Sequence, residues 1–137
     1  MPTSRSLPVL RADRLRRPPR SFAWLDHRLR SGGWLVRLEA GEIALYSFLT
    51  LAADSQGLSC WRLDRIEREL PMDIAALHRA REELVRADLI AFRPWRQGCL
   101  DGSYQVLELP PSAPAPPRGS GPVAIGQLLF GPSGICR

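Results

Sequence analysis

The sequence predicts a mostly helical α+β domain that carries a small β-hairpin and lies between two disordered tails. Three observations predict it. Apolar residues recur at helical spacing through much of the chain before residue 87, two short apolar runs follow, and both ends are rich in proline, glycine or arginine. We therefore divide the 137 residues into an arm over 1–19, a single domain over 20–109 and a flexible tail over 110–137.

A first helix is predicted to begin near Ser21, which is a suitable N-cap. Its apolar face, at positions i, i+3 and i+7, consists of Phe22, Leu25 and Leu29. We expect Trp24 to lie in the core, because large aromatic side chains dominate core burial. The run Ser31-Gly32-Gly33 should end this helix. We expect the chain to return to the core after this turn, through the apolar residues Trp34, Leu35 and Leu38.

A second helix is predicted over residues 39–53, with Glu42 near its positive N-terminal end. It is apolar nearly all round, so we expect it to be the central core helix, with a homodimer contact as a second possible use. The polar turn 54–57 follows, and residues 58–61 can add a short strand beside the hairpin.

Two short helices separated by a break are predicted next. The apolar face of the first consists of Leu63, Ile66 and Leu70. Pro71 ends that helix, since proline disfavours the helical conformation in the residue before it. Asp73 is a good N-cap for the second helix, over residues 73–87. Its buried stripe consists of Ile74, Leu77, Ala80 and Leu84. Residues 89–92 and 104–109 then read as two strands, joined by a polar loop over 94–102.

From residue 58 to 109 the chain resembles winged helix-turn-helix regulators of the GntR and MarR type, and the winged-helix domains of plasmid and phage replication initiators. The shared pattern is an apolar-spaced helix, a turn, a helix ending in L-x-x-x-x-L-I, here Leu84 to Ile90, and a hairpin called the wing. The family usually has glycine where Asp88 stands, and aspartate tolerates the left-handed conformation better than most residues. Arg81, where the family often has an apolar residue, is the stronger departure and bears on the tilt of the helix. Residues 22–55 also resemble small helix-turn-helix proteins of bacterial mobile elements.

The resemblance implies that the helix over 73–87 enters the major groove of double-stranded DNA. The side chains opposite its apolar stripe are Ala75, Ala76, His78, Arg79, Glu82 and Arg86. We expect Arg79 to read a base, because arginine can pair bidentately with guanine, and His78 to add a base or phosphate contact. Ala75 and Ala76 would allow apolar contact with a thymine methyl group. The candidate phosphate contacts on the preceding helix are Arg62, Arg65 and Arg68. Those at the wing are Arg93, Trp95 and Arg96.

The net charge of +5 is unevenly distributed. All nineteen basic residues are arginine, and six of them lie in residues 1–20 against the single acid Asp13. Residues 21–109 hold eleven arginines against thirteen acids. The arm is therefore either an electrostatic extension along phosphates or into a minor groove, or a solubilising leader. The arm residues expected to contact DNA are Arg14, Arg16 and Arg17. The absence of lysine and asparagine favours a GC-rich, bacterial source.

No feature of the sequence predicts an enzyme, a cofactor or a metal site. There is no glycine-rich phosphate loop, no paired histidine and no nucleophile elbow. Cys60, Cys99 and Cys136 follow no disulfide or zinc spacing, so we expect a reducing cytoplasm. No apolar run is long enough for a membrane span, and arginines at the N-terminus are not followed by the apolar core of a secretory signal.

Two functions remain open at this stage. The first is a sequence-specific DNA-binding protein, acting in transcription or in replication or transposition of a mobile element. The second is a winged helix that serves as a protein-interaction module in a larger assembly. The second is favoured by the near-neutral domain, because non-specific DNA affinity comes almost wholly from cationic contacts. The tail, whose end is apolar over 123–130, could dock on a protein partner.

Overall fold

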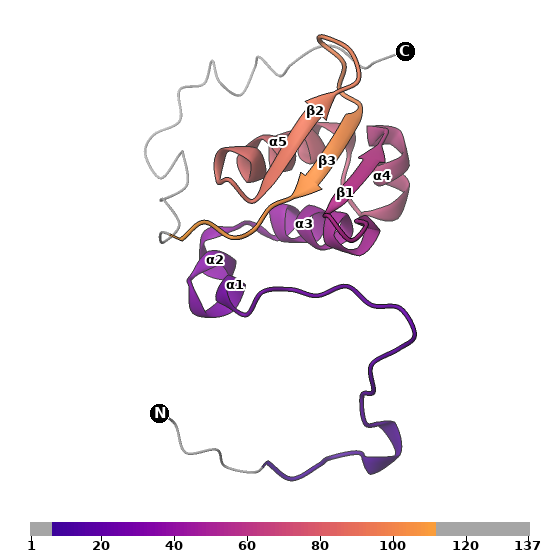
Figure 1. Ribbon diagram of the computed structural model, residues 1–137, viewed down its shortest axis with the longest axis vertical. Coiled ribbons are helices and arrows are strands. Elements are labelled where there is room, and N and C mark those ends of the chain that lie inside the picture. The colour runs from indigo at the N-terminus through magenta and orange to yellow at the C-terminus, as the bar shows by residue number, and fades with distance from the viewer. Residues whose placement is uncertain (1–6, 112–137) are drawn as a thin grey trace.

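Helices α3 and α5 lie against each other and against one face of a three-stranded antiparallel sheet (Figure 1). The computed structural model describes residues 7–111, and the predictions for 1–6 and 112–137 lie outside them. A 3-10 turn, η1, spans Ala12–Arg14. The helices are α1 (Arg28–Ser31), α2 (Trp34–Arg37), α3 (Ala40–Ala52), α4 (Leu63–Glu69) and α5 (Ile74–Arg86). The strands are β1 (Leu58–Trp61), β2 (Ile90–Pro94) and β3 (Gly102–Val106). The predicted α+β class is confirmed.

The predicted helix starting at Ser21 is wrong. Residues 21–26 are not helical, and α1 begins only at Arg28, because the Asp26 carboxylate accepts a hydrogen bond from the Arg28 backbone N–H at 2.8 Å and starts the helix there. Leu29 is buried as expected. Trp24, expected in the core, is instead 74% exposed, and Phe22 and Leu25 are also exposed.

The short helix α2 returns the chain to the core, as predicted, after a turn at Gly33, whose φ of +84° is one that glycine adopts without strain. Trp34 and Leu38 are buried. Leu35, expected on the core, is instead 44% exposed. The core role of α3 is confirmed, since Leu45, Tyr46 and Leu49 along it are buried.

The break between α4 and α5 follows the prediction closely. Leu63 and Ile66 are buried on α4, which ends at Glu69 before Pro71. The Asp73 carboxylate caps α5 by accepting a hydrogen bond from the backbone N–H of Ala76 at 2.7 Å. The buried stripe of α5 consists of Leu77, Ala80, Arg81 and Leu84, with Ile74 only partly buried.

The strand order is β1-β3-β2, so the predicted extra strand lies beside the hairpin. Ser59 and Phe92 both face Tyr104 across the sheet, on opposite sides of β3. The last strand begins two residues earlier and ends three earlier than predicted, and Leu109 is buried after it. Asp88 adopts a φ of +59°, the left-handed conformation expected there.

The cysteines depart from expectation at one position. Cys60 is exposed and free, whereas Cys99 is buried and disulfide-bonded, contrary to the expectation of no disulfide. Within residues 7–111, no helix has the length and apolar character needed to cross a membrane.

Candidate nucleic-acid interface

The solvent-facing side of α5 carries the residue predicted to read DNA. Arg79 is exposed and forms no ion pair with any other described residue, and Ala75 is exposed one turn before it. Ala76 is half-buried. Arg86 is exposed near the end of the helix and forms an ion pair with Glu83. Arg79 is thus the more available of the two exposed arginines on α5.

His78 is less available than the sequence suggested. Its side chain is 14% exposed, and its Nε2 lies 3.7 Å from the Glu82 carboxylate. Burial, with a contribution from the nearby Arg81 charge, lowers the pKa of His78 below its ordinary value. The imidazole is therefore neutral at pH 7 and adds no positive charge to this face.

Three exposed arginines lie on and immediately before helix α4, as predicted. Arg62 precedes the helix and lies 3.2 Å from the Asp64 carboxylate in an exposed pair. Arg65 and Arg68 are exposed and form no ion pair within residues 7–111. Exposed pairs such as Arg62–Asp64 contribute little stability, so the arginine can exchange its carboxylate for a phosphate at small cost.

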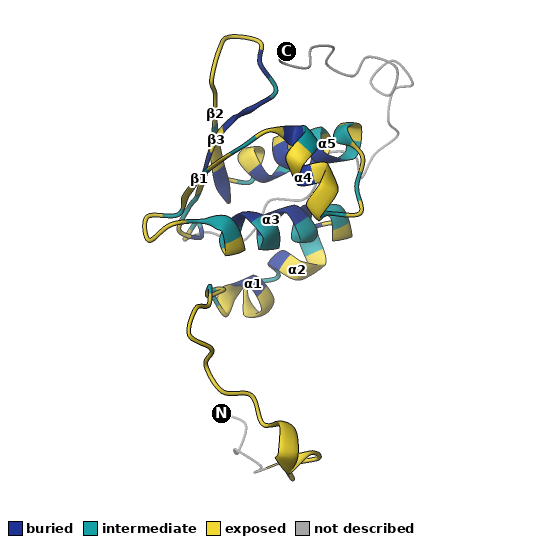
Figure 2. Ribbon diagram, turned by 90° about the vertical axis from the view of Figure 1, so that its right-hand side faces the viewer, coloured by how far each residue is buried: buried dark blue, intermediate teal, exposed yellow. Residues whose placement is uncertain are grey.

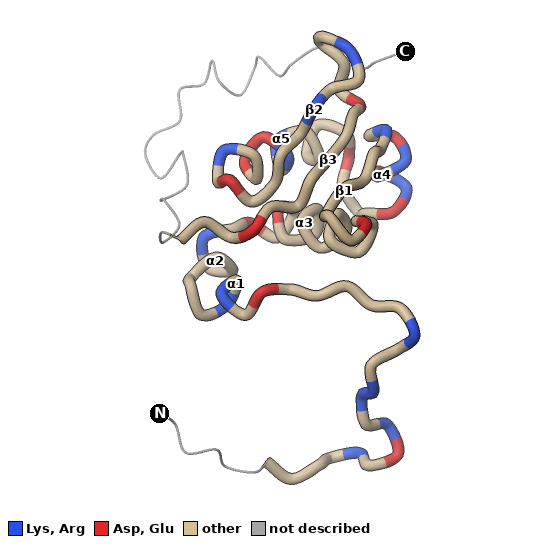
Figure 3. The backbone as a smooth tube through the Cα atoms, in the orientation of Figure 1, with Lys and Arg blue, Asp and Glu red and all other residues tan. Residues whose placement is uncertain are grey.

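The loop between β2 and β3 forms the tip of the hairpin, which projects beyond the helices (Figure 1). Trp95 is 49% exposed, and its backbone N–H donates to the Asp101 carbonyl at 3.1 Å. Arg93 and Arg96 are exposed, and basic residues are visible on β2 and at the loop (Figure 3). The loop therefore presents an indole ring and two cations next to one another in the chain.

Arg81 fixes this loop to α5, a role that the sequence did not reveal. Its side chain is 2% exposed, and its Nη1 donates to the Leu100 carbonyl and, at 3.1 Å, to the Tyr104 hydroxyl. The guanidinium also lies 3.8 Å from the centroid of the Phe92 ring. One feature of the sequence indicates that Arg81 is buried, namely its position within the apolar stripe of α5.

Asp101 makes the corresponding connection to α4. It is 5% exposed, and its carboxylate accepts a hydrogen bond from the backbone N–H of Leu63 at 2.8 Å, near the first turn of α4. Sequence reasoning missed Asp101, because it appeared only as one polar residue of a loop. Arg81 and Asp101 together hold α4, α5 and the hairpin in one arrangement.

A buried ionic cluster joins the other side of α5 to α2 and α3. Arg37 forms ion pairs with Glu83 of α5 and, at 3.7 Å, with Glu42 of α3. Both side chains of the second pair are less than 10% exposed. Burial raises the pKa of Glu42, and the nearby Glu39 charge raises it further, although Arg37 opposes the shift.

The arm does not lie on this surface. Arg14, Arg16 and Arg17 are exposed, as are all the other residues between 7 and 20, and this described part of the arm extends away from the domain (Figure 2). The structure thus brings α4, α5 and the hairpin together and leaves the arm apart from them.

Searches against protein-family models, curated proteins and solved structures gave no match to this chain.

Proposed function

We propose that this chain is a DNA-binding protein of the winged helix-turn-helix type, with α5 as the helix that enters the major groove. It would act as a transcriptional regulator, or as a DNA-binding factor in replication or in a mobile element. One observation carries the proposal: Arg79 is exposed, without an ion pair to any described residue, on a capped helix that contacts both α4 and strand β2. A helix presented in this way is the element that such folds place against base edges.

Exposed arginines on the two elements that contact α5 would supply phosphate contacts. Arg65 and Arg68 project from α4, and Arg93 and Arg96 from the hairpin. Phosphate contacts position a protein on the duplex without reading its sequence, whereas Arg79 would supply a base contact. The side chains that hold the two flanks, Arg81 and Asp101, would then set the orientation of α5 on the DNA.

The charge distribution assigns separate roles to the domain and the arm. Because acids slightly outnumber arginines in residues 21–109, the domain alone attracts phosphates weakly. The six arginines of residues 1–20 would provide most of the non-specific affinity, and α5 most of the discrimination among sequences. Such a protein would work at the nucleoid in the bacterial cytoplasm.

The test is an alanine substitution at Arg79, measured on a cognate site selected from a random duplex library. Loss of one bidentate guanine contact should cost about 1–3 kcal/mol of binding free energy and relax the preference at one base position. Arg30→Ala is the matched control, because Arg30 is exposed on α1 outside the proposed surface. Equal affinity of Arg79→Ala and the parent for the site would refute the assignment of α5. Failure of the parent to select any duplex would favour the protein-interaction function.

A further inference from the structure

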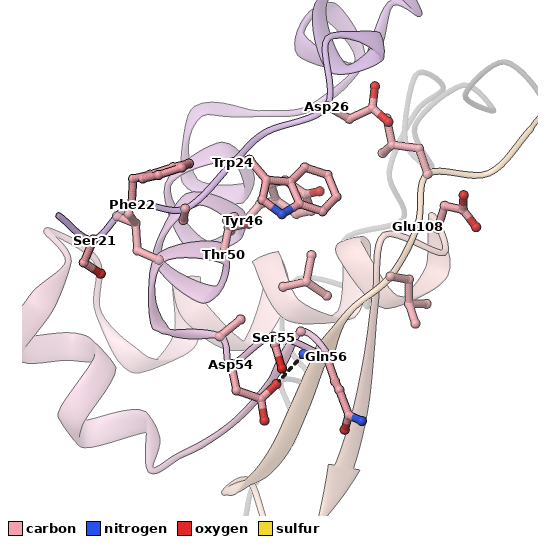
Figure 4. A pocket seen from close by; sticks show the side chains of 17 residues that line it. Ser21, Phe22, Trp24, Asp26, Tyr46, Thr50, Asp54, Ser55, Gln56 and Glu108 are labelled. Carbon is pink, nitrogen blue, oxygen red and sulfur yellow. Dashed lines mark hydrogen bonds between the residues drawn. The ribbon is translucent and has the colours of Figure 1, made fainter. Parts of the chain in front are cut away.

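A cavity of about 520 Å³ opens between residues 21–26, the second half of α3, the turn over 54–57 and the chain leaving β3 (Figure 4). Its volume lies within the range of small-molecule sites. It is at the end of β3 near Val106, whereas the β2–β3 loop is at the other end, near Gly102. No residue of α5 lines it, so a ligand could bind here without touching the proposed DNA-reading helix.

Three aromatic side chains line the cavity, and two of them are left uncovered by the fold. Phe22 is 69% and Trp24 74% exposed, whereas Tyr46 is 6% exposed. Covering the two exposed rings with an apolar or planar ligand would remove a large apolar area from water. The faces of aromatic rings also attract cations.

The ionisable side chains that line the cavity, apart from Tyr46, are carboxylates. They are Asp26, Asp54 and Glu108, and no arginine or histidine is among the described lining residues. Asp54 is held in place by accepting backbone hydrogen bonds from Gln56 at 2.8 Å and Leu58 at 2.9 Å.

The other two carboxylates differ in their partners. Asp26 is paired with Arg28 at 2.8 Å, whereas Glu108 forms no ion pair or hydrogen bond with any described residue and interacts with Arg28 only through its charge. Figure 4 shows Asp26 and Glu108 toward one side of Trp24 and Asp54 on the other. The cavity therefore keeps a net negative charge after the Arg28 contact is counted.

Tyr46 adds a hydroxyl group to the lining of the cavity. Its side chain lines the cavity, yet its hydroxyl forms no hydrogen bond with any described residue. Burial, with a smaller contribution from Asp26, raises the pKa of Tyr46 above its ordinary value, so the hydroxyl keeps its proton. A ligand in the cavity could form a hydrogen bond with this hydroxyl.

We propose that this cavity is a binding site for a small organic cation. The ligand's planar or apolar body would lie against Trp24 and Tyr46, and its ammonium, amidinium or guanidinium group would face Glu108 and Asp26. This proposal does not depend on DNA binding, since the site shares no residue with α4, α5 or the hairpin loop.

The test uses three probes of nearly equal shape and different charge: benzamidine, benzamide and benzoate. Each is titrated into the full-length chain by isothermal calorimetry at low salt. Benzamidine should bind at least about tenfold more tightly than benzamide, the factor that corresponds to about 1.4 kcal/mol for one charge-assisted contact. Benzoate should bind most weakly of the three.

Two variants assign the binding to this cavity. Glu108→Gln should weaken benzamidine severalfold and leave benzamide unchanged, and Trp24→Ala should weaken both probes. Both residues are exposed, so neither substitution should disturb folding. Glu69→Gln, which removes an exposed carboxylate from α4, is the control and should have no effect. Absence of benzamidine binding, equal binding of the three probes, or benzamidine binding unchanged in both variants would overturn the proposal.

Discussion

The guanidinium of Arg81 lies over the ring of Phe92, 3.8 Å from its centroid, and joins helix α5 to strand β2. The same guanidinium donates to the Leu100 carbonyl and the Tyr104 hydroxyl. No carboxylate among residues 7–111 forms an ion pair with it. This buried cation is therefore held by neutral oxygens and an aromatic face, and the position of the hairpin depends on it.

Replacing Arg81 with alanine should destabilise the domain by about 2–4 kcal/mol. The substitution leaves a cavity and removes the donor to two oxygens, and both effects are costly in a core. Urea unfolding followed by circular dichroism measures the change. Arg79→Ala is the control and should lie within about 0.5 kcal/mol of the parent, because Arg79 is exposed. A similar small change for both variants would show that Arg81 does not hold the hairpin.

Asp73→Ala should cost about 1 kcal/mol of stability, because it removes the oxygen that accepts the Ala76 backbone N–H at the start of α5. Asp73→Ser should keep most of that stability, since serine is also a favoured N-cap. Thermal unfolding of the two variants gives the comparison. The capping assignment fails if serine and alanine are equally destabilising.

The sequence was informative where local patterns decide the structure. The Pro71 break, the Asp73 cap and the left-handed Asp88 are local features, and each appears as predicted. The helix at Ser21 failed because apolar spacing does not show whether a surface exists to cover it. Phe22 and Trp24 are covered by none of residues 7–111, and the Asp26 carboxylate starts α1 later.

The candidate site could be predicted only in part for a similar reason. Exposed arginines such as Arg65 and Arg79 follow from helical spacing, and the structure places them on the surface. Arg81 and Asp101 act across 19 and 38 residues of sequence, through Leu100 and Leu63 respectively. Contacts at such separations depend on tertiary packing, which a single sequence does not display.

Glu42 makes the stability of the domain depend on pH. Burial raises the pKa of the Glu42 carboxyl in the folded state. The protonated carboxyl therefore contributes fully to the free energy of unfolding below the unfolded-state pKa, and this contribution is lost as the pH rises through the folded-state pKa. Glu42→Gln keeps the shape and removes this titration. The stability of Glu42→Gln relative to the parent should therefore increase between about pH 4 and pH 7. Urea unfolding at several pH values checks it, and a difference that stays constant or decreases would contradict the assignment.

Gly102 leaves no room for a side chain in the hairpin. A Cβ there would lie 2.2 Å from the Arg93 carbonyl oxygen and 2.8 Å from a carbon of the Phe92 ring. Gly102→Ala should thus cost about 1–3 kcal/mol of stability, as expected for overpacking. At Gly41 on α3 the near atom is the flexible end of Met72, so Gly41→Ala should be close to neutral. The denaturation midpoints of the two variants are compared with that of the parent. Equal losses of stability in both variants would contradict the close contact at Gly102.

The most direct test of DNA binding is fluorescence anisotropy with a random-sequence duplex over a range of salt concentrations. The full chain is compared with a variant in which Arg14, Arg16 and Arg17 are alanine. We expect the parent to bind at low salt, with affinity that decreases linearly on a double logarithmic plot. The variant should bind more weakly, with a slope reduced by about 0.9 for each lost phosphate contact. Absence of binding by the parent at low salt would contradict the account.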